Sequence, residues 1–110
     1  MICERYDVVV LPFPFHEIPV RKRRPVVVIS GSGFNQANGW TIVAMITTAK
    51  ETSWPSDVQI KDLETAALKV PCIVRPRFQT MPNEIIARRI GTLGSLDRLS
   101  CERQLADMLL

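Results

Sequence analysis

The architecture of this chain follows from two β-branched runs, YDVVVLPFPF at residues 6–15 and RPVVVIS at residues 24–30. Valine and isoleucine favour extended backbone, and the prolines at positions 12 and 14 end the first run because proline cannot donate to a strand ladder. We therefore expect strands at residues 6–11 and 25–30, joined by a long polar and basic loop. Both runs carry apolar side chains on alternate sides, so both faces of the sheet should be covered.

The rest of the chain continues the β pattern. Further strands are expected at residues 40–46, 57–60, 72–78 and 84–90, with a turn or single helical turn at 34–39 and a helical turn at 63–68. Within residues 72–78, Arg75 and Arg77 share one face, opposite Cys72, Val74 and Phe78. Pro76 interrupts this strand, which predicts a sheet edge or a bulge.

The last segment, from about residue 97 to 110, has the spacing of a helix. An apolar stripe runs along it at positions i, i+4, i+7 and i+8: Cys101, Leu105, Met108 and Leu109. Short strands followed by one helix predict a mainly β fold. We expect a curled, barrel-like, SH3-like antiparallel sheet packed against a C-terminal α-helix.

Size and composition bound the organisation of the protein. The chain has 110 residues, of which 46% are hydrophobic, so residues 1–110 are expected to form a single domain. Dimerisation would bury additional surface in a domain this small, which favours a symmetric homodimer. No apolar run is long enough to span a membrane, and charges interrupt the first seven residues, unlike a signal peptide. Three scattered cysteines do not suit a disulfide framework, so we expect a cytoplasmic protein with no membrane contact.

The formal net charge is only +3, but the cations are unevenly distributed. A basic run occupies residues 21–24, and four arginines follow later in the chain: Arg75, Arg77, Arg88 and Arg89. Clustered arginines bind phosphates through Coulomb attraction and forked hydrogen bonds, although a solvated face explains many such runs. Charge alone does not separate RNA from DNA, or either of them from an acidic protein.

The signatures of most nucleotide and metal sites are missing from the sequence. Gly31-Ser32-Gly33 is not followed by the glycine and lysine of a phosphate-binding loop. The cysteines and the one histidine, His16, show no paired metal-ligand spacing, so no metal and no other cofactor is expected. A single histidine also excludes a ribonuclease that uses two histidines as acid and base. A metal-free site of arginine, threonine and loop residues remains, and RNA suits it because the 2′-hydroxyl can attack the neighbouring phosphorus.

Several segments occur in a characteristic order along the chain. YDVVVLPFPF is followed by a basic loop, RPVVVIS, Phe34-Asn35, Ile46-Thr47 at a strand end, and IGTL at residues 90–93. This order resembles the MazF/PemK toxins of type II toxin–antitoxin systems, within the Kid/CcdB superfamily, over nearly the whole chain. PFPF and the Arg24-Pro25 pair are its most specific parts. The resemblance implies a plasmid-toxin-like fold and a metal-independent, sequence-selective endoribonuclease that cleaves single-stranded mRNA.

The same resemblance implies roles for individual residues. Arg24 would stabilise the scissile phosphate, and Thr47 would hold a phosphate oxygen or the attacking hydroxyl. Arg75 falls where PemK-like members place a proton-donating arginine, and His16 resembles their loop histidine near the phosphate. Glu17 beside it is a candidate base or substrate contact.

One position departs from the family pattern. The acid expected two residues after the strand arginine is Arg77, which removes the most natural general base. Either Glu17 or His16 then takes that role, or the enzyme is weaker. Arg77 itself suits the wall of a groove along which the RNA backbone binds. The remaining substrate-binding candidates are Phe15, Arg23 and Thr48; an aromatic residue on a loop stacks on a base or anchors the loop.

The expected reaction leaves a 2′,3′-cyclic phosphate and a 5′-hydroxyl. The implied partners are RNA, a second copy of the chain, and a cognate acidic antitoxin that covers the basic groove; promoter DNA is contacted only through the antitoxin complex. Two alternatives stay open. A CcdB-type gyrase-binding toxin shares the fold but carries a tryptophan close to its C-terminus, whereas this chain ends Asp107-Met108-Leu109-Leu110. A catalytically inactive nucleic-acid-binding relative is suggested by Arg77.

Overall fold

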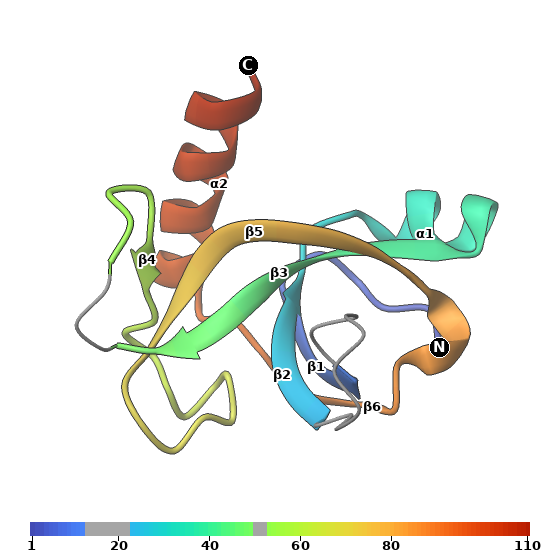
Figure 1. The fold of residues 1–110 in the computed structure, drawn as a ribbon, viewed down its shortest axis with the longest axis horizontal. Coiled ribbons are helices and arrows are strands. Elements are labelled where there is room, and N and C mark those ends of the chain that lie inside the picture. The colour runs from blue at the N-terminus through green and yellow to red at the C-terminus, as the bar shows by residue number, and fades with distance from the viewer. Residues whose placement is uncertain (13–22, 50–52) are drawn as a thin grey trace.

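The computed structural model describes residues 1–12, 23–49 and 53–110, which contain a six-stranded antiparallel sheet. The strands are β1 (Asp7–Pro12), β2 (Arg23–Val28), β3 (Trp40–Thr48), β4 (Val58–Gln59), β5 (Cys72–Pro82) and β6 (Arg88–Thr92). They lie in the order β4-β5-β3-β2-β1-β6. Two α-helices, α1 (Ser32–Asn38) and α2 (Ser95–Leu109), and the 3-10 turn η1 (Asn83–Ile85) complete the described elements. The sheet is curled, β5 arches across β3, and α2 stands at one side (Figure 1), so the predicted mainly β fold with a C-terminal helix is confirmed.

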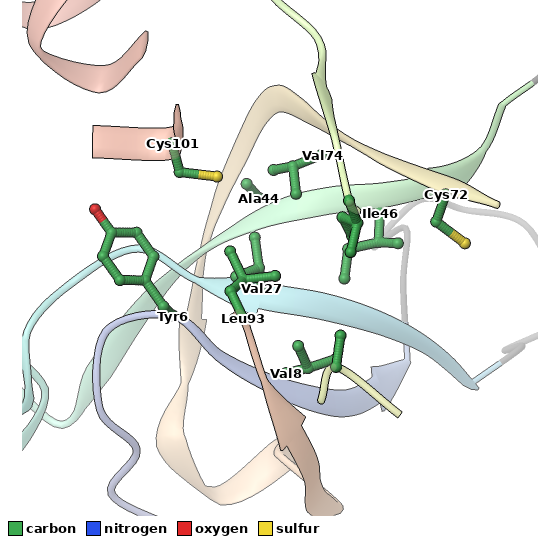
Figure 2. Packing of buried hydrophobic residues seen from close by; sticks show 11 residues of the cluster. Tyr6, Val8, Val27, Ala44, Ile46, Cys72, Val74, Leu93 and Cys101 are labelled. Atoms are coloured by element: carbon green, nitrogen blue, oxygen red, sulfur yellow. The ribbon is translucent and has the colours of Figure 1, made fainter. Parts of the chain in front are cut away.

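Both faces of the sheet are packed, as the apolar runs predicted. One face lies against α2 and forms the helix-side core, whose buried members include Tyr6, Val8, Val27, Ala44, Ile46, Cys72, Val74, Leu93 and Cys101 (Figure 2). The other face forms the opposite core: Cys3, Val9, Leu11, Val26, Val28, Val43, Met81 and Ile86. Neighbouring residues along a strand alternate between the two cores because their side chains point to opposite faces. Apolar packing therefore holds the sheet from both sides.

The first two strands begin at residues other than those predicted. β1 starts at Asp7 rather than Tyr6, because Tyr6 has a positive φ of 72° and its backbone turns before the ladder begins. β2 starts at Arg23, two residues before Pro25, since its pairing with β1 extends through Arg24 to Arg23. The ladder therefore holds the backbone of both arginines.

The strand predicted at residues 72–78 is longer in the structure. β5 continues to Pro82, and its pairing with β3 jumps from Arg75 to Phe78 across an irregularity. The predicted interruption at Pro76 is therefore a bulge. The short helical element expected at residues 34–39 is α1, and the strand expected at 57–60 is reduced to the two residues of β4.

The strand predicted at residues 84–90 is wrong in its first half. The turn η1 occupies that stretch, and β6 begins only at Arg88. The Asn83 side chain accepts a hydrogen bond from Thr41 Oγ1 (2.7 Å) and donates one to the Asn35 carbonyl (2.8 Å). These two bonds bind the chain at residue 83 to β3 and α1, so it turns there before it can extend again as β6.

The C-terminal helix buries only the first part of its apolar stripe. Cys101 is 3% exposed and packs in the helix-side core with Leu105, whereas Met108 is 38% and Leu109 66% exposed. The last turn projects beyond the sheet (Figure 1), so the second half of the predicted apolar stripe is exposed. In the described part of the chain, no helix combines the length and apolar character needed to cross a membrane.

A buried polar network ties α1 to the sheet and to the N-terminal segment. Asn35 is fully buried, and its amide donates to the carbonyls of Cys3 (2.9 Å) and Ser30 (3.2 Å). Its side-chain oxygen accepts from the Ser30 hydroxyl, which in turn accepts from the Ile42 N–H (2.8 Å). Among the described residues every buried side-chain polar atom has a partner, so removing one member of this network leaves others unpaired.

Replacing Asn35 by alanine should therefore lower the free energy of unfolding by about 2–3 kcal/mol, because buried polar groups of Cys3 and Ser30 lose their partners. The matched control is Asn38→Ala in the same helix, where the side chain is exposed and bonds only the Phe34 carbonyl. That change should stay within about 0.5 kcal/mol. Urea unfolding monitored by circular dichroism measures both, and equal losses would contradict the assigned role of Asn35.

Candidate functional site

Arg24 and Thr47 lie together at one end of the sheet. β2 and β3 pair with Val26 opposite Met45, and two further residues along that register bring Arg24 to the level of Thr47. Both residues line one open pocket of about 380 Å³. Arg24 is exposed and Thr47 is half-buried, so a guanidinium and a hydroxyl border the same space. The structure thus brings together the two residues that the resemblance placed at the centre of the site.

The same pocket has a wall that the sequence did not indicate. Residues 68–70 form this wall, which carries the exposed Lys69 and the half-exposed Val70. Lys69 adds a second cation to the pocket. No motif marks this lysine, because its place depends on how the chain returns between β4 and β5. The other lining residues are Pro25, Ile46, Thr48, Leu68 and Cys72.

Cys72 is the one thiol that borders this pocket in the described ranges. The residue is 6% exposed, and burial raises the pKa of its thiol above the usual value. A thiol with a raised pKa stays protonated near neutral pH and is a poor nucleophile. Cys72 therefore contributes packing to the pocket wall, as its place in the helix-side core indicates.

Arg75 does not line the pocket and instead bonds to Asp57. Its Nε donates to one carboxylate oxygen (3.1 Å) and an Nη to the other (3.0 Å), with side-chain exposures of 13% for Arg75 and 8% for Asp57. β4 and β5 pair with Val58 opposite Val74, so one step further along the register sets Asp57 opposite Arg75. Direct cross-strand neighbours share a face, which explains the forked geometry.

The ion pair shifts both groups toward their charged forms. Hydrogen bonds from the Arg75 guanidinium lower the pKa of Asp57, and the Trp54 backbone N–H lowers it further against the opposing effect of burial. The same bonds raise the pKa of Arg75. No local sequence signal marks Asp57 as the partner of Arg75, because an aspartate before a two-residue strand meets an arginine on the next strand only through the register of the sheet.

The sheet places the predicted cations and hydroxyl on one face. Ile46 and Val74 belong to the helix-side core, so their neighbours Thr47 and Arg75 point away from α2. Arg24 shares its face of β2 with Val26 and Val28 of the opposite core, so it also points away from α2. Arg24, Thr47 and Arg75 therefore occupy the same side of the sheet.

The remaining predicted site residues fall into two groups. Thr48 lines the pocket, whereas Arg23 and Arg77 are exposed and do not border it. Phe15, His16 and Glu17 lie outside the described residues. Among residues 1–12, 23–49 and 53–110, no three His, Cys, Asp or Glu side chains are grouped so that they could hold a metal ion.

A family model described as the PemK-like, MazF-like toxins of type II toxin-antitoxin systems matches residues 4–109. The fold is similar to MazF from Deinococcus radiodurans (18% identity, 99% of this chain and 97% of that chain, TM-score 0.75). It is also similar to the Mycobacterium tuberculosis toxin MazF-mt6 (20% identity, 92% and 93%, TM-score 0.71). A third similar structure is an endoribonuclease in complex with its cognate antitoxin from a mycobacterial species (14% identity, 98% and 93%, TM-score 0.75). A comparison with curated protein sequences finds no match.

The Asp57–Arg75 pair makes stability depend on pH in a defined direction. The folded-state pKa of Asp57 is lower than its ordinary value of 3.8, so the stabilisation is present above that pH and is lost as the pH falls through the lowered pKa. The Asp57→Asn variant should have a lower free energy of unfolding than the unmodified protein at pH 7. This difference in free energy should become smaller below pH 3.8. Urea midpoints at pH 7 and from pH 4 to 2 test this, with the exposed Asp107→Asn as control. If the difference in stability between the two proteins stays constant across this pH range, the ion pair does not contribute to that difference.

Proposed function

Because this chain belongs to the PemK-like, MazF-like toxins of type II toxin-antitoxin systems, we propose that it is a metal-independent endoribonuclease that cleaves single-stranded RNA. The observation that carries this proposal is the shared pocket of Arg24 and Thr47. An exposed guanidinium beside a hydroxyl is suited to bind the oxygens of a phosphodiester. Lys69, which lines the same pocket, adds positive charge for a neighbouring phosphate.

The proposed reaction uses the substrate's own nucleophile. The 2′-oxygen forms a bond to phosphorus while the bond from phosphorus to the 5′-oxygen breaks, which leaves a 2′,3′-cyclic phosphate and a 5′-hydroxyl. Arg24 stabilises the charge that develops on the phosphorane oxygens, and Thr47 donates a hydrogen bond to one of them or positions the 2′-hydroxyl.

Two proton transfers complete this reaction. A base removes the 2′-hydroxyl proton, and we assign it to Glu17 or His16 because Arg77 stands where the family has an acid. An acid protonates the 5′-oxygen, and Arg75 is the family's candidate for that step. The Arg75 guanidinium bonds Asp57 here, so proton donation by Arg75 requires that RNA draw it from the carboxylate.

The proposed partners follow from exposed charge and exposed apolar surface. A cognate antitoxin with an acidic segment would neutralise the cations of the pocket and exclude RNA, and the complex would contact promoter DNA through the antitoxin. Met108 and Leu109 at the end of α2 are exposed, as is Leu110 after it, and burial of these residues favours a homodimer. We place the protein in the cytoplasm, where mRNA is found.

A catalytically inactive RNA-binding relative is the second candidate function. Arg77 stands where the family has an acid near Arg75, and the Arg75 guanidinium is bound to the Asp57 carboxylate. In this candidate, RNA binds to the protein but is not cleaved. A CcdB-type gyrase toxin has less support, because such a toxin catalyses nothing and would not need the pocket that Arg24 and Thr47 share. RNA cleavage separates the ribonuclease from both alternatives, and binding of an uncleavable RNA separates the inactive RNA-binding relative from the gyrase toxin.

Substitution of Arg24 tests the proposed chemistry. Purified protein should cleave mRNA equally well with and without EDTA, and Arg24→Ala should lower kcat by about 100- to 1,000-fold because charge on the phosphorane loses its partner. Arg103→Ala, an exposed arginine on α2, is the matched control and should cleave normally. Sequencing of the cleaved ends should report cyclic phosphates and 5′-hydroxyls. Cleavage that EDTA abolishes, or that survives Arg24→Ala, contradicts the proposal.

The hydroxyl of Thr47 gives a second, independent test. Thr47→Val keeps the β-branched shape of the strand end but removes the hydrogen-bond donor, so kcat should fall by about 10- to 1,000-fold. Thr47→Ser should retain most of the activity. The control is Thr80→Val on the exposed part of β5, which should leave cleavage unchanged. Equal rates for Thr47→Val and the unmodified chain would remove Thr47 from the site.

A further inference from the structure

Trp54 is a large apolar side chain that is exposed and yet held in place. The residue is 44% exposed. Its backbone N–H donates to Asp57 Oδ2 (2.8 Å), and its carbonyl accepts from the Asp57 N–H (3.0 Å). These two bonds close a tight turn on Trp54 and Asp57, so the backbone that carries the indole is fixed immediately before β4.

The indole ring itself is positioned by Arg75. The guanidinium carbon lies 5.1 Å from the ring centroid, within the range of a cation–π contact. Both arms of that guanidinium are tied to Asp57, so its plane has little freedom. Trp54, Asp57 and Arg75 thus form a closed unit, the tryptophan frame, in which each member holds the next.

The frame lies on the side of the sheet that carries the proposed phosphate site. Arg75 pairs with Met45, and Thr47 pairs with Ile73, so the two residues are separated by two steps along the β3–β5 ladder. Two steps along a strand correspond to about 7 Å. A nucleotide whose phosphate lies at Arg24 and Thr47 can therefore place its own or its neighbour's base near the frame.

We propose that Trp54 is a stacking platform for one nucleobase of the single-stranded RNA held at the Arg24–Thr47 pocket. The proposal rests on the ribonuclease function proposed above and adds a base-binding position to it. Bases of every identity present a π-face to an aromatic ring, so this position contributes affinity and orientation with little sequence preference. Because the frame holds the indole before RNA binds, less side-chain entropy is lost on stacking.

Fluorescence offers a direct test, because the chain contains only two tryptophans. Trp40, 47% exposed at the opposite end of β3 from Thr47, is replaced by phenylalanine, which leaves Trp54 as the sole tryptophan. The probe is a mixed-sequence single-stranded oligonucleotide with 2′-O-methyl riboses, which cannot be cleaved because it has no free 2′-hydroxyl. Stacking should quench the fluorescence of Trp54 as the oligonucleotide is added. An abasic oligonucleotide of equal length should quench this fluorescence far less. Equal quenching by both probes, or bound oligonucleotide without quenching, overturns the proposal.

Cleavage kinetics separate the platform from the catalytic proposal. Trp54→Ala should raise KM about 5- to 100-fold with a smaller effect on kcat, Trp54→Phe should restore most of the loss, and Trp40→Phe should match the unmodified chain. If the unmodified protein does not cleave RNA, the proposed function fails. If it cleaves RNA and Trp54→Ala cleaves with unchanged KM, only the platform fails. If poly-glutamate quenches the fluorescence of Trp54 and the oligonucleotide does not, the stacking platform is overturned in favour of a protein-binding role.

Discussion

The register of β3 between β2 and β5 is the constraint on which the site depends. Val26 lies opposite Met45 on one side of β3, and Ile73 lies opposite Thr47 on the other. This pairing sends Arg24, Thr47 and Arg75 to the face away from α2. A slip of one residue would turn each of these side chains into the helix-side core, where a charged group without a partner is strongly unfavourable.

Two packed cores keep that register from slipping. Valines of β1 and β2 alternate between the helix-side core and the opposite core, so either face would lose its apolar contacts if a strand moved. The network around Asn35 and Asn83 then fixes α1 and the turn η1 against β3. The far end of β3, which carries Thr47 and Thr48, is thus supported by a rigid sheet although it borders an open pocket.

Two arginines form ion pairs with carboxylates in the part of the chain that the structure describes. Arg75 is bound to Asp57, and Arg89 forms an ion pair with Asp7 (3.0 Å) at the β1–β6 edge. Arg24 and Lys69 are exposed and line the same pocket. The net charge of +3 therefore says little about where a phosphate binds; the distribution of acidic partners decides it.

Local patterns were enough to foresee the β-branched strands, the terminal helix and an interruption at Pro76, because propensity and proline geometry act over a few residues. They left open whether that interruption was a sheet edge or a bulge. The order of family segments was enough to nominate Arg24 and Thr47. The partner of Arg75, the presence of Lys69 in the pocket and the late start of β6 were not foreseen. Each of these depends on contacts between residues far apart in the chain: Asp57 meets Arg75 through strand register, and Asn83 turns the backbone because Thr41 and Asn35 hold it. Such contacts exist only once the sheet has formed, since no local preference encodes which distant residue becomes a neighbour.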